Sequence, residues 1–448
     1  MHRRSSALVV AALAATLTAC VIQPPPLPSP VEAWRVDDRL VTMPHEESGT
    51  LVAYTTAGPD SLEVVAWDGA DGTELWRVPS APLASGRAAE IVPLDDGSGR
   101  LVVPVLVPEG DAVRWSVRDL LTGEEQAWST SSADGTPASW EQVYQLWRCG
   151  PEQPATSLCF SVPDGTETTA EFLRIRPGHG VDLLPVAQQG SIFATQLGLY
   201  TDRSTQTIDL MVDGAIRWSR PWADAFSHVF ADGAIDVRRA GDLLLVTSAP
   251  GWFSRTLQLE SIDTVALDVD SGAVRWRVEG AMPCTDADSA TILLCEMGGT
   301  DDDSGTRYTS VAVVGTDLAT GEERWRATYP ESGVEMQNGE GRWSWFSPVH
   351  ALLPDEAGQP VVVDVATGQQ RAVPVDAPLP CAQGGSTVAW TDGALSIPIA
   401  ELPAWCDASG TLVAEPEVDP VVLEAITTRI GDTWVMATPS GLVGYRLG

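Results

Sequence analysis

One spacing recurs along this chain: an apolar run ends in an Asp, a Gly follows four residues later, and a Trp follows four residues after the Gly. Recurrence at intervals of tens of residues is typical of a repeat architecture, in which one supersecondary unit is copied and stacked. Three copies keep the whole pattern, namely Asp68-Gly72-Trp76, Asp268-Gly272-Trp276 and Asp317-Gly321-Trp325.

Three further copies are degenerate, each in a different way. One has its Trp a place late, one has Ala372 where the Trp is expected, and one has lost the Asp. The residues that these copies retain are Asp119, Gly123 and Trp128, then Asp364 and Gly368, then Gly214 and Trp218.

Each copy predicts a β-hairpin. Apolar runs such as Val64 to Trp67 have strand character, Asp starts a turn by accepting backbone N–H bonds, and Gly supplies the positive φ of a tight turn. A further β-rich segment, for example Arg100 to Val107, lies upstream of each copy. We therefore expect an all-β fold in which each unit has four antiparallel strands, the size of a propeller blade.

The recurrent Trp is expected to pack between blades, because a blade cannot bury both of its faces alone. The alternative is that one or two of these Trp side chains line a ligand groove. For the Asp, turn capping is the favoured interpretation and metal ligation is the alternative, and no metal site is predicted.

The Asp-x-x-[Ser/Thr]-Gly-x-x-x-Trp pattern resembles the pyrroloquinoline-quinone (PQQ) type repeat of eight-bladed β-propellers, a group within the broader WD40-like and YVTN-like propellers. The family includes quinoprotein dehydrogenases, the lipoprotein of the outer-membrane barrel-assembly machinery and many actinobacterial lipoproteins. The resemblance implies a single propeller over residues 31–448, and the motif specifies a fold better than an activity.

The resemblance implies eight blades, and the sequence leaves seven and nine open. Three of the nine candidate final strands are degenerate, so one weak unit is expected to be an inserted or partial hairpin. The candidates lie near Trp34, Trp76, Trp128, Leu184, Trp218, Trp276, Trp325, Ala372 and Leu412, and the degenerate ones are Leu184, Ala372 and Leu412.

The last repeat stops one strand short. Residues Thr433 to Thr438 and Gly441 to Gly448 have strand character, but no Trp-bearing strand follows. The stretch Val31 to Val36 matches the missing strand, since it reads like the residues around Trp76 and Trp276. We predict that Trp34 closes the ring by main-chain pairing beside Tyr445.

The N-terminus predicts export. Residues 1–19 have a basic start, an apolar stretch and small residues before Cys20, which resembles a bacterial lipobox, and residues 20–30 form a Pro-rich tether. By that resemblance Cys20 is lipidated and holds the chain on the outer side of the cell membrane. The alternative is an ordinary signal peptide with an incidental Cys.

Six Cys remain after Cys20, and exported proteins meet oxidising conditions. Their order favours bridges between sequence neighbours over the other connectivities that six Cys allow. These residues are Cys149, Cys159, Cys284, Cys295, Cys381 and Cys406.

Charge and missing motifs narrow the function. The net charge of −34, with 61 acidic residues, disfavours nucleic acid as a partner. PQQ is not expected, because the chain has no adjacent Cys pair, no C-x-x-C-H and a single Asn, Asn338. Weak Ca²⁺ binding at Asp301, Asp302 and Asp303 is an alternative to a plain interstrand loop, although the EF-hand pattern fails at Ala312.

Two functions remain. The first is a monomeric, non-enzymatic scaffold or binding module for an envelope protein or cell-wall ligand; the second is a hydrolase or lyase with acidic residues in the central channel. Long connections are expected at Gly299 to Tyr308, Ser332 to Trp345 and Pro250 to Ser261. The loop aromatics that would meet a partner, or fold back on the scaffold, are Trp252, Phe253, Trp343, Trp345 and Phe346.

Overall fold

The computed structural model describes most of residues 28–448. The segments outside the description are 131–138, 141–142, 164–169, 185–191, 195, 203–205, 213–214, 228–233, 250–261, 286–289, 303–304, 329–333, 336–344, 383–386, 391–394, 401, 408–410 and 414–415, together with 1–27. Gly214, Cys20, Trp252, Phe253, Trp343 and Asp303 therefore lie outside the described residues.

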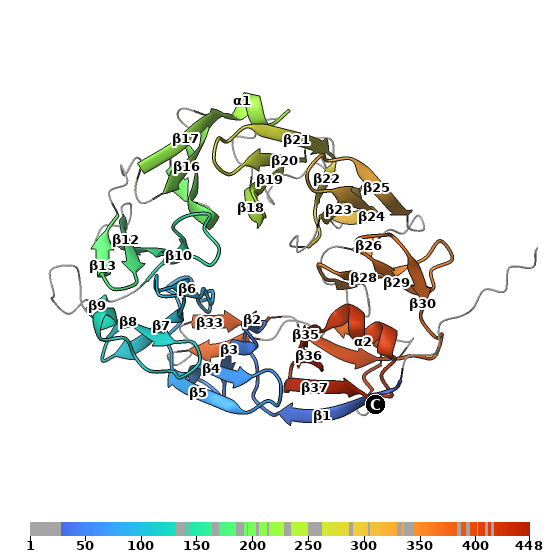
Figure 1. Cartoon of the computed structure of the whole chain (residues 1–448), viewed down its shortest axis with the longest axis horizontal. Coiled ribbons are helices and arrows are strands. Elements are labelled where there is room, and N and C mark those ends of the chain that lie inside the picture. The colour runs from blue at the N-terminus through green and yellow to red at the C-terminus, as the bar shows by residue number, and fades with distance from the viewer. Residues whose placement is uncertain are drawn as a thin grey trace, which may run out of the picture.

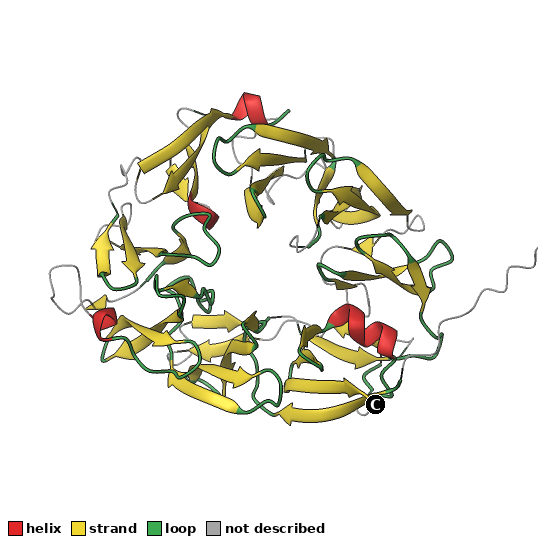
Figure 2. Ribbon diagram, in the orientation of Figure 1, coloured by secondary structure: helices red, strands yellow, loops and turns green. Residues whose placement is uncertain are grey.

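The described strands form eight antiparallel blades arranged in a ring (Figure 1). Seven blades have four strands, and the sixth has a fifth strand, β26 (Val334–Glu335), on β24. The expected all-β propeller of eight blades is confirmed, and Figure 2 shows strands joined by loops, with only short helices among the described residues.

The blades are numbered here in chain order, each from its innermost strand outwards. Blade 1 is β2 (His45–Glu47), β3 (Thr50–Thr56), β4 (Leu62–Asp68) and β5 (Glu74–Pro79). Blade 2 is β6 (Leu94–Asp95), β7 (Leu101–Glu109), β8 (Ala112–Asp119) and β9 (Ser139–Trp140). Blade 3 is β10 (Gln145–Arg148), β11 (Leu158–Pro163), β12 (Ala170–Arg176) and β13 (Gly180–Leu183). Blade 4 is β14 (Ile192–Ala194), β15 (Leu199–Asp202), β16 (Thr207–Val212) and β17 (Ala215–Pro221).

The second half of the ring is built in the same way. Blade 5 is β18 (Ala234–Ala240), β19 (Leu243–Ala249), β20 (Asp263–Asp268) and β21 (Val274–Glu279). Blade 6 is β22 (Ala281–Pro283), β23 (Thr291–Asp302), β24 (Gly305–Asp317) and β25 (Glu323–Thr328). Blade 7 is β27 (Trp345–Phe346), β28 (His350–Pro354), β29 (Pro360–Asp364) and β30 (Gln370–Ala372). Blade 8 is β35 (Thr428–Ile430), β36 (Thr433–Thr438), β37 (Gly441–Leu447) and β1 (Pro30–Val36).

Blade 8 joins the two ends of the described chain. Strand β1 pairs antiparallel with β37, with Trp34 opposite Gly444 and Glu32 opposite Tyr445 (Figure 1). The pairing skips one residue between Glu32 and Trp34, as β5 does just before Trp76 opposite Ala66. Because register and bulge repeat, β1 has the same place in blade 8 as β5 has in blade 1.

Residues 373–427 are an insertion between blades 7 and 8. They contain two short hairpins, β31 (Leu379–Ala382) with β34 (Pro403–Cys406) and β32 (Thr387–Trp390) with β33 (Leu395–Pro398), and the helix α2 (Pro420–Ile426). The ninth candidate, near Leu412, belongs to this insertion and does not end a blade. Its backbone only bridges to Cys406, and its side chain is exposed.

The insertion reaches across blade 8 to the start of the ring. Trp405 packs with Met436 and Tyr445 of blade 8, whereas Ile397 is fully buried in the core shared by blades 1, 2 and 3. The Ala400 amide donates to the Val41 carbonyl at 2.8 Å, just before β2. The ring is thus held at its seam by a second element besides β1, which we call the strap; it consists of residues 387–390, 395–400 and 402.

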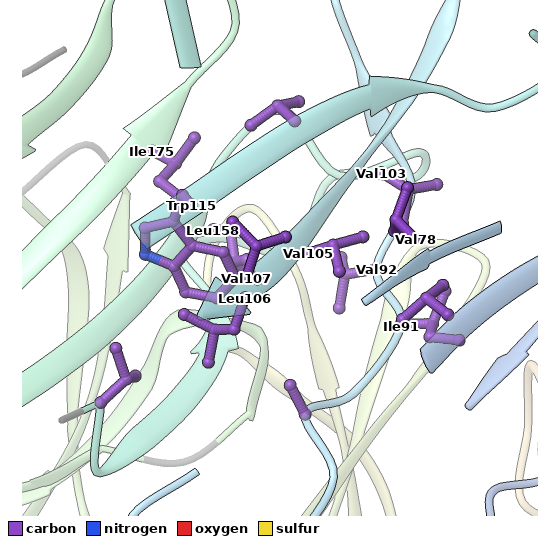
Figure 3. Packing of buried hydrophobic residues seen from close by; sticks show 14 of the residues in the cluster. Val78, Ile91, Val92, Val103, Val105, Leu106, Val107, Trp115, Leu158 and Ile175 are labelled. Carbon is purple, nitrogen blue, oxygen red and sulfur yellow. The ribbon is translucent and has the colours of Figure 1, made fainter. Parts of the chain in front are cut away.

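The core lies between blades and not within one central cluster. Figure 3 shows blade 2 packed between its two neighbours. Val78 of β5 in blade 1 and Leu158 of β11 in blade 3 flank the apolar strand β7 of blade 2. Trp115 of β8 meets Phe160 of β11 edge to face, with ring centroids 5.3 Å apart. Burial of this apolar surface stabilises each blade against its neighbours.

Two expectations for local structure are wrong. Trp128 does not lie on an outer strand: after the Arg118–Glu125 bridge the chain turns into the 3-10 helix η1 (Ala127–Thr130), and β9 is supplied by Ser139–Trp140. The connection expected from Gly299 to Tyr308 is instead the end of the long β23–β24 hairpin. Two smaller helical turns, η2 (Gln196–Gly198) and α1 (Trp222–Ala225), lie in blade 4 and after it.

Candidate functional site

The repeat Asp caps its own turn. Oδ1 of Asp119 accepts from the amides of Leu121 and Thr122 at 3.0 and 2.8 Å, and Asp68, Asp268, Asp317 and Asp364 each accept from amides two or three residues on. The Ser271 hydroxyl and then Arg275 lower the pKa of Asp268 to about 2. These carboxylates are occupied in building turns.

The repeat Gly lies against the Trp of the preceding blade. Gly72, Gly123, Gly272, Gly321 and Gly368 all have positive φ, and a Cβ on any of them would stand between 2.5 and 2.7 Å from an indole atom. The rings concerned belong to Trp34, Trp76, Trp218, Trp276 and Trp325, in that order. The position therefore excludes a side chain for two reasons, backbone conformation and close approach.

The repeat Trp also donates a hydrogen bond across the same interface. Nε1 of Trp76 donates to the Leu120 carbonyl at 2.8 Å, and Trp218, Trp276 and Trp325 donate to the equivalent carbonyls of Val269, Leu318 and Val365. Trp34 donates to Ala70 at 3.1 Å. These Trp side chains join blades, and none of them is available to line a ligand groove.

Three disulfides each join neighbouring segments of the chain. Cys149–Cys159 joins β10 to β11 in blade 3, and Cys381–Cys406 joins β31 to β34 at the base of the insertion. Cys284–Cys295 fixes the segment after β22 to β23. Each bridge joins sequence neighbours among the six Cys.

The other sequence candidates do not form a site. Trp345 and Phe346 are half-buried against the scaffold, and only Trp345 borders a hollow. Asp301 and Asp302 are described in their backbone alone, at the tip of the β23–β24 hairpin. Within the described residues, no group of three or more His, Cys, Asp or Glu side chains is placed to hold a metal ion.

A hollow of about 400 Å³ lies between blades 1 and 2. Its walls are two equivalent segments, residues 42–45 leading into β2 and residues 88–91 leading into β6. Both strands are the innermost of their blades, and β10 of blade 3 is next around the ring (Figure 1). Its volume is within the range of small-molecule sites, roughly 300–1,000 Å³.

Opposite charges meet at the rim of this hollow. Nη2 of Arg148, at the end of β10, lies 3.5 Å from Oε1 of Glu90, and the two side chains are 22% and 42% exposed. This is the only polar contact of the Arg148 side chain in the described part of the chain. Arg77, by contrast, contacts three carboxylates at 2.8 Å. Because a guanidinium has five N–H donors, Arg148 has further donors that no described residue accepts from.

His45 forms part of the wall and is held neutral. Burial, and then the positive charge of Arg148, lower the pKa of His45 to about 4. Its Nε2 is buried and has no hydrogen-bond partner in the described structure. Near neutral pH the hollow thus has one positive and one negative charge at its rim and an uncharged imidazole in its wall.

Apart from Thr42, whose hydroxyl accepts from the Tyr54 amide at 3.1 Å, the remaining lining is apolar. Met43, Pro44 and Ile91 line the hollow with Ala88 and Ala89, and Met43 is 48% exposed. A second hollow of about 50 Å³ shares Met43 and Pro44 and extends to Trp345, Pro403 of the insertion and Ile426 of α2. Met43 and Pro44 therefore form a common wall between a charged hollow and an apolar one.

Sequence reasoning missed this hollow because its three functional residues belong to no motif. His45, Glu90 and Arg148 are separated by tens of residues and meet only because consecutive blades repeat the same geometry. One signal was present: His45 lies in β2 and Arg148 in β10, each the innermost strand of its blade, whereas Glu90 lies in the segment that leads into β6.

Known structures resemble this chain at low sequence identity. No family model matches the chain, and no curated protein matches its sequence. Among solved structures, BamB from Moraxella catarrhalis is 13% identical with a TM-score of 0.32, over 94% of this chain and 99% of that one. A europium-containing methanol dehydrogenase is 11% identical with a TM-score of 0.34, over 72% of each chain. The β-propeller domain of the Trilobed protease from Pyrococcus furiosus is 10% identical with a TM-score of 0.36, over 85% of this chain and 100% of that one. Similarity at this level concerns the fold alone.

Proposed function

We propose that this chain is an exported, lipid-anchored β-propeller that serves the cell envelope as a non-enzymatic binding module. The hollow between blades 1 and 2 carries the binding part of this proposal, because His45 and Glu90 line it and Arg148 of the next blade lies 3.5 Å from Glu90. A rigid ring that presents such a recess is suited to holding a ligand.

The cysteines and the N-terminus support the proposed location of the protein outside the cytoplasm. All six Cys after Cys20 are paired in the structure, as expected for a protein that matures under oxidising conditions. Cys20 follows small residues and precedes the Pro-rich tether. None of the described helices is long and apolar enough to cross a membrane. Attachment through a lipid on Cys20 is the proposed means of anchoring.

The chemistry of the hollow favours binding over hydrolysis. A hydrolase of the kind considered above needs two carboxylates as acid and base. The described residues around this hollow supply one, Glu90. We therefore retain a binding module, acting as a monomer on an envelope ligand, as the proposed function.

Anchoring is tested by expressing the full chain and its Cys20→Ser variant in a bacterial host. We expect the wild-type chain in the membrane fraction with the mass of a diacylglyceryl group at Cys20, and the variant released from the membrane. A wild-type chain without lipid, or a variant that partitions with membranes as the wild type does, would contradict the proposed anchoring.

A further inference from the structure

We propose that the hollow between blades 1 and 2 binds a free α-amino acid with an apolar side chain. In this arrangement the α-carboxylate pairs with Arg148 and the α-ammonium with Glu90. The inference rests on the binding part of the proposed function and adds the chemical class of the ligand.

The charges at the rim select a zwitterion. Arg148 and Glu90 present opposite charges 3.5 Å apart. A ligand that satisfies both must carry its own two charges equally close, as an α-amino acid does with both groups on one carbon. A guanidinium is also well matched to a carboxylate, since it can donate two parallel hydrogen bonds.

The charge of the whole protein points the same way. With a net charge of −34, the protein repels multiply charged anions such as phosphates. A simple cation would satisfy Glu90 and be repelled by Arg148. A zwitterion has no net charge, so the overall negative charge of the protein does not repel it. It also carries a carboxylate for Arg148 as well as an ammonium for Glu90. His45 adds no further charge because its pKa is held near 4.

The walls of the hollow account for the apolar side chain. Met43, Pro44 and Ile91 offer an apolar surface, and a volume of about 400 Å³ is at the lower end of the range for small-molecule sites. Met43 is partly exposed and conformationally adaptable, as Met side chains are. A branched or thioether side chain therefore fits against Met43, toward the apolar hollow beyond it.

The ligand arm of the test uses three probes with the same side chain. Leucine is a zwitterion, leucinamide keeps only the ammonium, and N-acetylleucine keeps only the carboxylate. Each is titrated calorimetrically into the full chain in detergent. We expect saturable binding of leucine and affinities for the two blocked probes that are roughly three- to tenfold lower, because each loses one partly exposed ion pair.

The protein arm uses Arg148→Gln and Glu90→Gln. The Arg148→Gln variant should bind leucine and leucinamide with equal affinity. The Glu90→Gln variant should bind leucine and N-acetylleucine with equal affinity. Arg371→Gln is the matched control, because Arg371 pairs with Glu424 at 2.8 Å on blade 7 and α2, and it should bind leucine like the wild type. Unchanged thermal unfolding shows that each variant is folded.

Three results would overturn the inference. The first is that leucine shows no saturable binding. The second is that either N-acetylleucine or leucinamide binds as tightly as leucine, and the third is that the Arg148→Gln variant binds leucine like the wild type. The fractionation of the Cys20→Ser variant is independent of these titrations. A chain that is anchored but does not bind leucine would contradict the ligand class and leave the proposed anchoring intact.

Discussion

The indole of Trp218 in blade 4 lies directly against the α-carbon of Gly272 in blade 5, so that a Cβ on Gly272 would stand 2.6 Å from Cδ2 of the ring. The same contact occurs at four other blade interfaces, together with the indole hydrogen bond. The recurrent spacing of Asp, Gly and Trp in the sequence therefore reflects a contact between neighbouring blades. The importance of this contact for stability can be tested with matched substitutions.

Gly272→Ala and Gly241→Ala separate the two reasons for glycine. Both residues lie in turns of blade 5 with nearly equal positive φ, +64° and +62°, but nothing lies within 4 Å of a Cβ at Gly241. We expect Gly241→Ala to cost about 1 kcal/mol of unfolding free energy from the backbone alone. Gly272→Ala should cost about 1–3 kcal/mol more, because Trp218 must also move. Equal losses in chemical denaturation would show that the close approach is not a constraint.

Because β1 closes the ring through Trp34, we expect the residues of β1 to contribute unequally to the free energy of unfolding. Trp34→Ala should lower the free energy of unfolding by about 2–3 kcal/mol, since it removes a half-buried ring and its hydrogen bond to Ala70. Val31→Ala, in the same strand at a side chain that is 59% exposed, should change it by less than about 0.5 kcal/mol. Similar losses for the two variants would argue against closure through Trp34.

The strap should also contribute to the stability of the ring. Ile397 is fully buried against residues of blades 1 to 3, so Ile397→Ala should cost about 2–4 kcal/mol. Leu412→Ala is the control in the same insertion, because Leu412 is 56% exposed, and it should be nearly neutral. If thermal melting showed Ile397→Ala to be neutral as well, the insertion would be an appendage and not a strap.

His45 makes stability depend on pH. Between its unfolded pKa of about 6.5 and its folded pKa of about 4, the unfolded chain binds a proton that the folded chain does not, so stability falls as pH falls. Above this window the group has no effect. His45→Gln removes the dependence, and it should gain about 2 kcal/mol relative to the wild type on going from about pH 7 to about pH 5. A constant difference between the two unfolding curves over this range would contradict a buried, neutral His45.

Much of the fold could be predicted from local chemistry. The Asp turns, the positive φ at Gly72 and its equivalents, and the pairing of β1 with β37 all follow from residue types at fixed spacing. The contact of each Gly with a Trp could not be predicted, because the two residues belong to different blades. Trp128 was misplaced because the chain leaves the hairpin after the Arg118–Glu125 bridge and enters η1, so that a later segment supplies β9.

The candidate site lay beyond sequence reasoning for a related reason. Arg148 and Glu90 are 58 residues apart, and neither belongs to the repeat. Their proximity results from the rotation between blades 2 and 3. Once the blades are placed, Arg148 of blade 3 lies 3.5 Å from Glu90, which lines the hollow.

The most direct test of this account is hydrogen–deuterium exchange of the full chain, with and without saturating leucine. The ligand should slow exchange in the three segments that meet at the hollow, residues 42–45, 88–91 and 145–148, and leave the outer strands β17, β21 and β25 unchanged. Unchanged exchange in all three segments, or protection confined to another part of the ring, would contradict a ligand site built by these three blades.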